Sequence, residues 1–143
     1  YKRQAPVDAP PEAPAPFEDP MRGRRVVVID DDPLVLDGTR GLLGTWGCEV
    51  VVASTADEAL ERLAGRAPDL IVADVHLDAG GCGLDAVRAV RARHGAAIAA
   101  LLVSGDVSGA TRARALEAGL PLLDKPVRPM VLRAAATRLL AGG

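Results

Sequence analysis

Several side chains that could bind a divalent cation and a phosphoryl group stand where short apolar runs of this chain end. They are Asp30, Asp31, Asp74, Ser104 and Lys125. Carboxylates that share one crevice repel each other and raise each other's pKa unless a cation offsets their charge. Mg²⁺ prefers oxygen ligands, and an acidic cluster without His or Cys suits it better than zinc. These residue types therefore predict Mg²⁺ as a cofactor.

Asp74 is the carboxylate that we assign as a nucleophile. A carboxylate can attack a phosphoryl donor in line when nearby positive charge neutralises the equatorial oxygens. Lys125 would supply an ammonium for that purpose, and the Ser104 hydroxyl would hold another oxygen. Asp32 is interpreted differently, because an Asp followed by a Pro is typical of a helix N-cap with proline at the first helical position.

The apolar runs alternate with segments of helical period, which indicates strands that are each followed by a helix. The runs are Val26–Ile29, Val50–Ala53, Leu70–Ala73, Ile98–Val103 and Leu120–Leu123. Continuous apolar strands joined by helices are typical of a parallel sheet covered on both faces. The predicted fold is therefore α/β, a (βα)5 doubly wound five-stranded parallel sheet. In such sheets ligands bind beyond the carboxyl ends of the strands, where the polar residues named above should meet.

The weakest predicted helix covers residues 110–118, where Arg112 and Arg114 interrupt a face of small residues. The first 20 residues hold six of the eleven prolines, mixed with Ala and acids. We interpret residues 1–22 as a Pro/Ala-rich linker or disordered tail, with a PxxP ligand as the alternative, and residues 23–143 as the folded domain. The chain begins with Tyr1 rather than Met, as a fragment of a longer protein would, although Met21 could be a native start.

The bulk composition argues against several classes of function. The net charge of -2 and the pI near 5.7 give no basic footprint for nucleic acid. Cys48 and Cys82 lie far apart and form no zinc or disulfide pattern, which is typical of reduced thiols in a cytosolic protein. No apolar run is long enough to span a membrane. We expect a cytoplasmic module without membrane contact of its own.

The ordered motifs VVVIDDDP, PDLIVADVHL, LLVSGD and LLDKPV resemble the receiver domain of two-component response regulators, with its flavodoxin-like fold. The resemblance covers nearly all of residues 24–141. It implies a phosphoacceptor rather than an enzyme with turnover, with Asp74 as the acceptor and a histidine kinase core or histidine phosphotransfer domain as the donor.

The resemblance also assigns the other positions of the site. It implies that Asp31 binds Mg²⁺ directly, that Asp30 reaches the ion mostly through water, and that Asp74 is a further ligand. The backbone carbonyl of His76 completes the protein ligands. Ser104 and Lys125 hold the phosphoryl oxygens. The Lys125–Pro126 bond is expected to be cis, as proline permits.

Two positions depart from the family pattern. Leu122 stands where most receivers have an aromatic residue or His that reorients with the switch hydroxyl, so the usual aromatic switch is absent. The loop HLDAGGCGLD after Asp74 has Asp78 where most receivers have Pro, and it is one residue longer. The loop and the later segments look most like receivers at the C-terminus of hybrid sensor histidine kinases, and the end at Gly143 without an output domain agrees with that context.

Three alternatives remain open from the sequence. The chain could be a stand-alone single-domain regulator, or a receiver-like module that binds partners without phosphorylation. It could also be a phosphatase of the haloacid dehalogenase type, in which Asp30 and Asp32 would form the reactive DxD pair and the position of Asp74 would have no explanation. The sequence does not identify the cognate kinase, the downstream target or the oligomeric state.

Overall fold

A five-stranded parallel sheet forms the centre of the fold in the computed structural model, which describes residues 19–77, 81–106 and 108–142. Its strands are β1 (Arg25–Ile29), β2 (Glu49–Ala53), β3 (Leu70–Asp74), β6 (Ala99–Ser104) and β7 (Leu122–Asp124). They lie in the order β2-β1-β3-β6-β7, and every neighbouring pair is parallel. Since the order reverses beside β1, the sheet is doubly wound and flavodoxin-like, as predicted.

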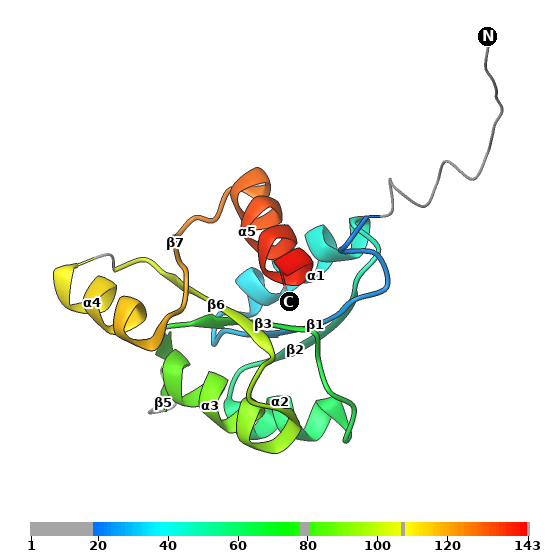
Figure 1. Cartoon of the computed structure of the whole chain (residues 1–143), viewed down its shortest axis with the longest axis horizontal. Helices are drawn as coiled ribbons and strands as arrows, with labels where there is room; N and C mark the ends of the chain where they lie inside the picture. The colour runs from blue at the N-terminus through cyan, green and yellow to red at the C-terminus, as the bar shows by residue number, and fades with distance from the viewer. Residues whose placement is uncertain (1–18, 78–80, 107, 143) are drawn as a thin grey trace, which may run out of the picture.

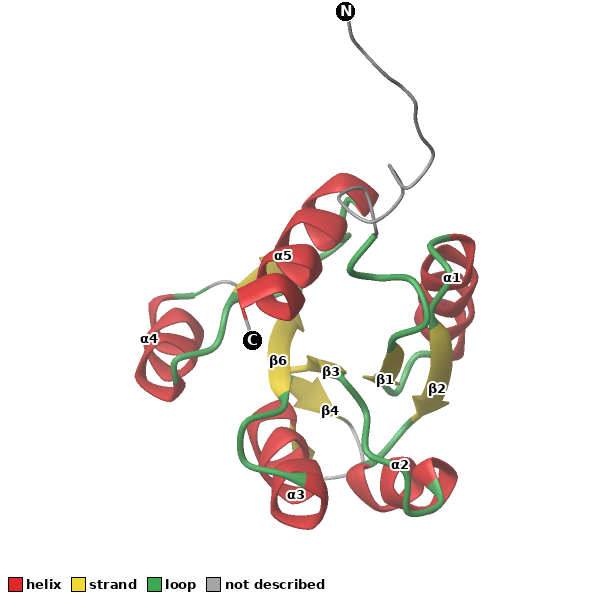
Figure 2. Ribbon diagram, turned by 45° about the vertical axis from the view of Figure 1, so that its right-hand side comes forward, coloured by secondary structure: helices red, strands yellow, loops and turns green. Residues whose placement is uncertain are grey.

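Helices cover both faces of the sheet (Figures 1 and 2). They are α1 (Pro33–Thr45), α2 (Ala56–Leu63), α3 (Gly83–His94), α4 (Gly109–Ala118) and α5 (Pro129–Gly142). Val26 and Val28 of β1 pack with α1 and α5, while Val27 and Ile29 pack with α2 and α3. This alternation follows from the period-two geometry of a strand, and because both faces are covered, β1 and β3 are apolar almost throughout.

The structure differs from the sequence prediction most clearly at the last strand and in the segment after β3. The last strand begins at Leu122 rather than Leu120, because Pro121 has no amide hydrogen to donate to the sheet and contributes only its carbonyl, which accepts from the Leu102 amide at 2.9 Å. A short antiparallel pair, β4 (His76–Leu77) and β5 (Gly81–Cys82), was not predicted. Its strands hold only two residues each, which is too short for a periodic signal.

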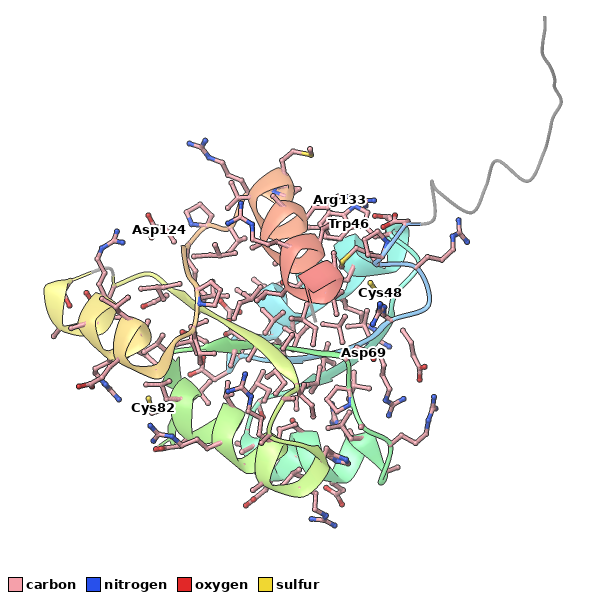
Figure 3. The ribbon with its side chains drawn as sticks, in the orientation of Figure 1. Trp46, Cys48, Asp69, Cys82, Asp124 and Arg133 are labelled. Atoms are coloured by element: carbon pink, nitrogen blue, oxygen red, sulfur yellow. The ribbon has the colours of Figure 1, made fainter. Side chains whose placement is uncertain are left out.

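The packed part of the chain begins earlier than the predicted boundary at residue 23. Met21 is fully buried in the core between the sheet and α5. Asp19 pairs with Arg133 of α5 at 2.5 Å, and the Arg133 guanidinium lies 5.1 Å from the centre of the Trp46 ring (Figure 3). Residues 19–22, which the sequence assigns to the linker, therefore contact the folded domain, and the linker prediction for residues 1–18 lies outside the described part of the chain.

Within the described residues, no helix is both long and apolar enough to cross a membrane.

Candidate functional site

The carboxyl ends of β1, β3 and β7 bring the acidic residues and the lysine together. Ile29 lies opposite Ala73 in the register of β1 and β3, so Asp30 and Asp74 follow at neighbouring positions. Asp32 then turns the chain into α1, because its carboxylate accepts from the Leu34 amide at 2.9 Å and Pro33 occupies the first turn. The predicted N-cap role of Asp32 is confirmed, and the cap fixes the loop that carries Asp31.

Lys125 bridges the two buried carboxylates of the site. Its Nζ donates to Asp30 Oδ2 and to Asp74 Oδ2, both at 2.8 Å. Asp30 and Asp74 are only 3% and 7% exposed, so solvent screens these ion pairs weakly. The lysine reaches the site from the Lys125–Pro126 bond, which is cis as predicted. The fold thus places Lys125 in contact with Asp74, although the two residues are 51 positions apart in the sequence.

Burial is the largest single influence on the pKa of both Asp30 and Lys125, but at Lys125 other interactions outweigh it. Burial raises the pKa of the Asp30 carboxyl above its ordinary 3.8, and the hydrogen bonds from Lys125 and from the Asp32 amide oppose that rise only partly. Burial acts to lower the pKa of Lys125, but its hydrogen bonds to Asp30 and Asp74 outweigh burial and raise that pKa above 10.5. Lys125 therefore stays charged, while ionised Asp30 carries a desolvation cost that a further cation would relieve.

The acidic residues fit a hard divalent cation. One carboxylate oxygen from each of Asp30, Asp31 and Asp74 lies within 4.8 Å of the others. The donor set contains oxygen alone, and the single ammonium of Lys125 is shared between the carboxylates of Asp30 and Asp74. Mg²⁺ suits such a site because it favours carboxylate oxygens and keeps several of its waters.

His76 contributes to the site through its backbone. Its amide donates to Asp74 Oδ1 at 3.1 Å, which holds the second oxygen of this carboxylate. The imidazole is mostly exposed, and its Nε2 lies 3.5 Å from Asp106 Oδ2. The proposed role of the His76 carbonyl as a metal ligand stays a prediction.

Ser104 lies at the end of β6, one residue beyond the position opposite Asp74. It is completely buried. Its hydroxyl donates to the Asp106 carbonyl and accepts from the Asp106 amide, each at 2.9 Å. The structure therefore brings Ser104 to the same edge of the sheet as the acidic cluster, with its hydroxyl bonded to the following loop.

Sequence analysis missed two residues that matter to this site. A Cβ on Gly83 would lie 2.2 Å from the Asp74 carbonyl oxygen, so only glycine lets α3 start this close to the acceptor. Gly83 belongs to the glycine-rich loop that the sequence analysis noted, but the pattern does not show which glycine is needed. Asp106 is the partner of Ser104, and the sequence signal was its position two residues after Ser104.

Leu122 lies in β7, at the edge of the sheet beside α4. It is half-buried and lines a hollow of about 570 Å³ together with Arg112, Asp124 and Arg128. Arg112 and Asp124 are both more than half exposed and lie 3.9 Å apart. This side of the molecule is therefore packed more loosely than the acidic site.

A doubly wound sheet with paired acids, a further Asp and a Lys at its strand ends is the arrangement expected of a receiver domain. The model of the response regulator receiver domain matches residues 26–137, and the chain belongs to this family.

Named relatives and solved structures agree with this assignment. The chain is 32% identical over 122 residues to the transcriptional regulatory protein AruR of Pseudomonas aeruginosa. The match covers 81% of this chain and 49% of AruR. It is 33% identical over 76 residues to the autoinducer sensor kinase/phosphatase CqsS of Vibrio cholerae, covering 53% of this chain and 11% of CqsS.

A CheY-like receiver structure from Methanospirillum hungatei superposes with a TM-score of 0.74 at 26% identity, covering 84% of this chain and 95% of that one. This chain thus spans nearly all of a receiver structure but half or less of AruR and CqsS. The chain is a receiver domain of the two-component response regulator type.

Proposed function

We propose that this receiver takes a phosphoryl group from a phosphohistidine onto Asp74, with Mg²⁺ bound by the acidic residues. The donor would be a histidine kinase core or a histidine phosphotransfer domain. The observation that carries the proposal is the bridge of Lys125 between Asp74 and Asp30, beside a third carboxylate. A half-buried ammonium in that place can move from the Asp74 carboxylate to an oxygen of the transferred phosphoryl group.

The transfer forms one bond and breaks one. An oxygen of the Asp74 carboxylate attacks phosphorus, the O–P bond forms, and the N–P bond of the phosphohistidine breaks with its electron pair passing to the imidazole nitrogen. The His76 amide and Lys125 hold the carboxylate in one orientation before the attack. Lys125 then exchanges its bond to Asp74 for one to a phosphoryl oxygen. When bound, Mg²⁺ would supply further positive charge for the equatorial oxygens.

An apolar groove next to Lys125 supports contact with a protein donor. The groove has a volume of about 480 Å³, and Leu34, Pro126 and Val127 are among its lining residues. Leu34 is 81% exposed although it stands three residues after Asp31. A donor protein that brings a phosphohistidine to Asp74 would cover this groove and bury Leu34, so the groove fits a helical donor better than a small phosphate ester.

The larger protein is proposed to be a hybrid histidine kinase with this receiver at its C-terminal part. The similarity to the sensor kinase/phosphatase CqsS supports that context, while the similarity to AruR supports a stand-alone regulator as the second candidate. In either context the module would act as a switch that is phosphorylated and then hydrolysed, rather than as an enzyme with metabolic turnover.

Acetyl phosphate with and without Mg²⁺ tests the proposal through the intact mass of the protein. We expect the wild type to gain one phosphoryl group only with Mg²⁺, and Asp74→Asn to gain none. Asp85→Asn is the matched control, because this acid is exposed on α3 and should not affect uptake. A wild type that gains no mass would contradict phosphoryl acceptance and favour a module that binds partners without phosphorylation.

A further inference from the structure

The hydroxyl of Ser104 makes both of its hydrogen bonds with Asp106, in the loop that follows β6. It is fully buried and donates its hydrogen to the Asp106 carbonyl, while the Asp106 amide donates back to it. A hydroxyl has one hydrogen to donate. If Ser104 donates to a phosphoryl oxygen on Asp74, it must therefore release the carbonyl of Asp106.

The carboxylate of Asp106 is tied in turn to the first turn of α4. Its Oδ1 accepts from the Ser108 amide at 2.9 Å, and its Oδ2 accepts from the Thr111 hydroxyl at 3.2 Å. Ser108 is the N-cap of α4, and Thr111 is 4% exposed. Hydrogen bonds to Ser108 and Thr111, with some contribution from His76, lower the pKa of Asp106, so it is ionised at neutral pH. One side chain thus joins the loop after Ser104 to the start of this helix.

A third contact connects Asp106 to the loop after Asp74. The imidazole of His76 lies 3.5 Å from Asp106 Oδ2, and the amide of His76 donates to Asp74. Asp106 therefore contacts His76 of β4 and Ser104 at the end of β6, as well as the N-terminal turn of α4.

Packing holds α4 weakly, so a change in these hydrogen bonds would not be resisted by a large core. Of its described residues, Thr111 and Ala115 alone are buried, and Leu116 is 81% exposed. The helix lies at the outer edge of the molecule beside β6 and β7 (Figure 1). Leu122, the neighbour on β7, offers no hydrogen-bonding or aromatic group that could respond to Ser104.

We propose that Asp106 is the residue that transmits the state of Asp74 to α4 in this chain. This inference rests on the proposed phosphoryl acceptance. When Ser104 turns to a phosphoryl oxygen, the Asp106 carbonyl loses the hydrogen bond from the hydroxyl, and the Asp106 carboxylate carries the displacement of this residue to Ser108 and Thr111. The first turn of α4 is then the part of the surface that differs between the two states.

Amide hydrogen exchange of residues 109–113, measured with and without acetyl phosphate and Mg²⁺, tests the proposal. The intact mass of each sample reports phosphoryl uptake separately. We expect phosphorylation to change exchange in this turn of the wild type. Asp106→Ala should speed this exchange about five-fold before any phosphate is added, because the first turn loses two acceptors. It should still take up the phosphoryl group, with no further change in α4.

Two further variants distinguish loss of the Asp106 hydrogen bonds to α4 from a general loss of stability. Asp106→Asn keeps one acceptor oxygen for the Ser108 amide, and its NH2 group can donate to the Thr111 hydroxyl in place of the second oxygen. It should therefore retain most of the response, although it loses the charge that faces His76. Asp85→Ala removes an equivalent acid from the first turn of α3 and should leave α4 unchanged. The proposal is overturned if Asp106→Ala exchanges like the wild type, or if its α4 still responds once phosphorylated. A wild type that takes up no phosphoryl group would instead contradict the proposed function. The exchange of Asp106→Ala and wild type without acetyl phosphate would still test whether Asp106 holds the first turn of α4.

Discussion

The acidic site and the α4 region differ in how firmly the rest of the protein holds them. Asp30 follows β1 and Asp74 is the last residue of β3, and both strands are buried throughout and pair with a strand on each side. Helix α4 precedes the edge strand β7, which has three residues, none of them fully buried. The acceptor and Asp30 stand at the ends of the two central, fully buried strands, whereas the edge formed by α4 and β7 is less buried.

This difference suggests a division of roles within one small fold. Chemistry needs atoms held within a fraction of an ångström, which paired central strands supply. Transmission of a signal requires an element that can shift at a small cost in free energy. An edge helix with few buried side chains, such as α4, meets that requirement. Substitutions on the two sides should therefore have different consequences, and the following experiments compare them in order of decreasing effect.

Removal of the Lys125 ammonium should have the largest effect. Lys125→Ala leaves Asp30 and Asp74 without their shared cation, so phosphoryl uptake from acetyl phosphate should slow by about 100-fold, as when a preorganised charge donor is lost. The rate of mass gain measures this loss. Lys125→Arg keeps the charge and should recover part of the rate. An unchanged rate for Lys125→Ala would show that the bridge is structural alone.

Substitution of the glycine beside the acceptor should mainly affect stability. In Gly83→Ala, the new methyl group would meet the Asp74 carbonyl at 2.2 Å. We expect a loss of about 2 kcal/mol in the free energy of unfolding, as for other overpacked sites. Gly41→Ala in α1 is the matched control, because nothing lies within 4 Å of its Cβ, and it should stabilise the protein. Equal effects of the two variants would contradict the close approach of α3 to β3.

Neutralisation of Asp30 should stabilise the protein without metal. Its raised pKa means that the folded state holds this proton more tightly than the unfolded chain, so the stability it contributes falls as pH rises through 3.8 toward the raised value. At neutral pH, Asp30→Asn should therefore raise the free energy of unfolding by about 1 kcal/mol and weaken the stabilisation by Mg²⁺. Urea denaturation with and without Mg²⁺ measures both. A less stable variant would mean that the bond to Lys125 outweighs the cost of burial.

The ion pair at the loose edge should matter least. Arg112 and Asp124 lie 3.9 Å apart, and both side chains are more than half exposed. Arg112→Ala should change the free energy of unfolding by less than about 0.5 kcal/mol, because solvent and salt screen such pairs. Thermal unfolding at low and high salt checks this. A larger loss would show that the edge is held more firmly than its burial indicates.

The central strands and the site positions could be predicted from the sequence because their signals are local. The apolar run before Asp30 and the run before Asp74 each mark a strand end, and the topology of a parallel sheet brings such ends together. The Asp32 cap and the cis bond before Pro126 have similarly local signals, and the structure shows both.

Other features depend on contacts between distant residues and have no sequence pattern of their own. The need for Gly83 appears only when α3 is placed against the Asp74 carbonyl. The link from Ser104 through Asp106 to Thr111 is a set of hydrogen bonds around a loop, and its residue types are common at turns. The burial of Met21 follows from its position between the sheet and α5, although the sequence predicts a Pro/Ala-rich linker or disordered tail over residues 1–22.

The central claim is that Asp74 is the residue that carries the phosphoryl group. Borohydride reduces an acyl phosphate on aspartate to homoserine, so treating the phosphorylated protein and sequencing its peptides by mass spectrometry identifies the reactive position. We predict homoserine at position 74 and unmodified aspartate at positions 30 and 31. Homoserine at position 30 would contradict the claim and favour a phosphatase of the haloacid dehalogenase type.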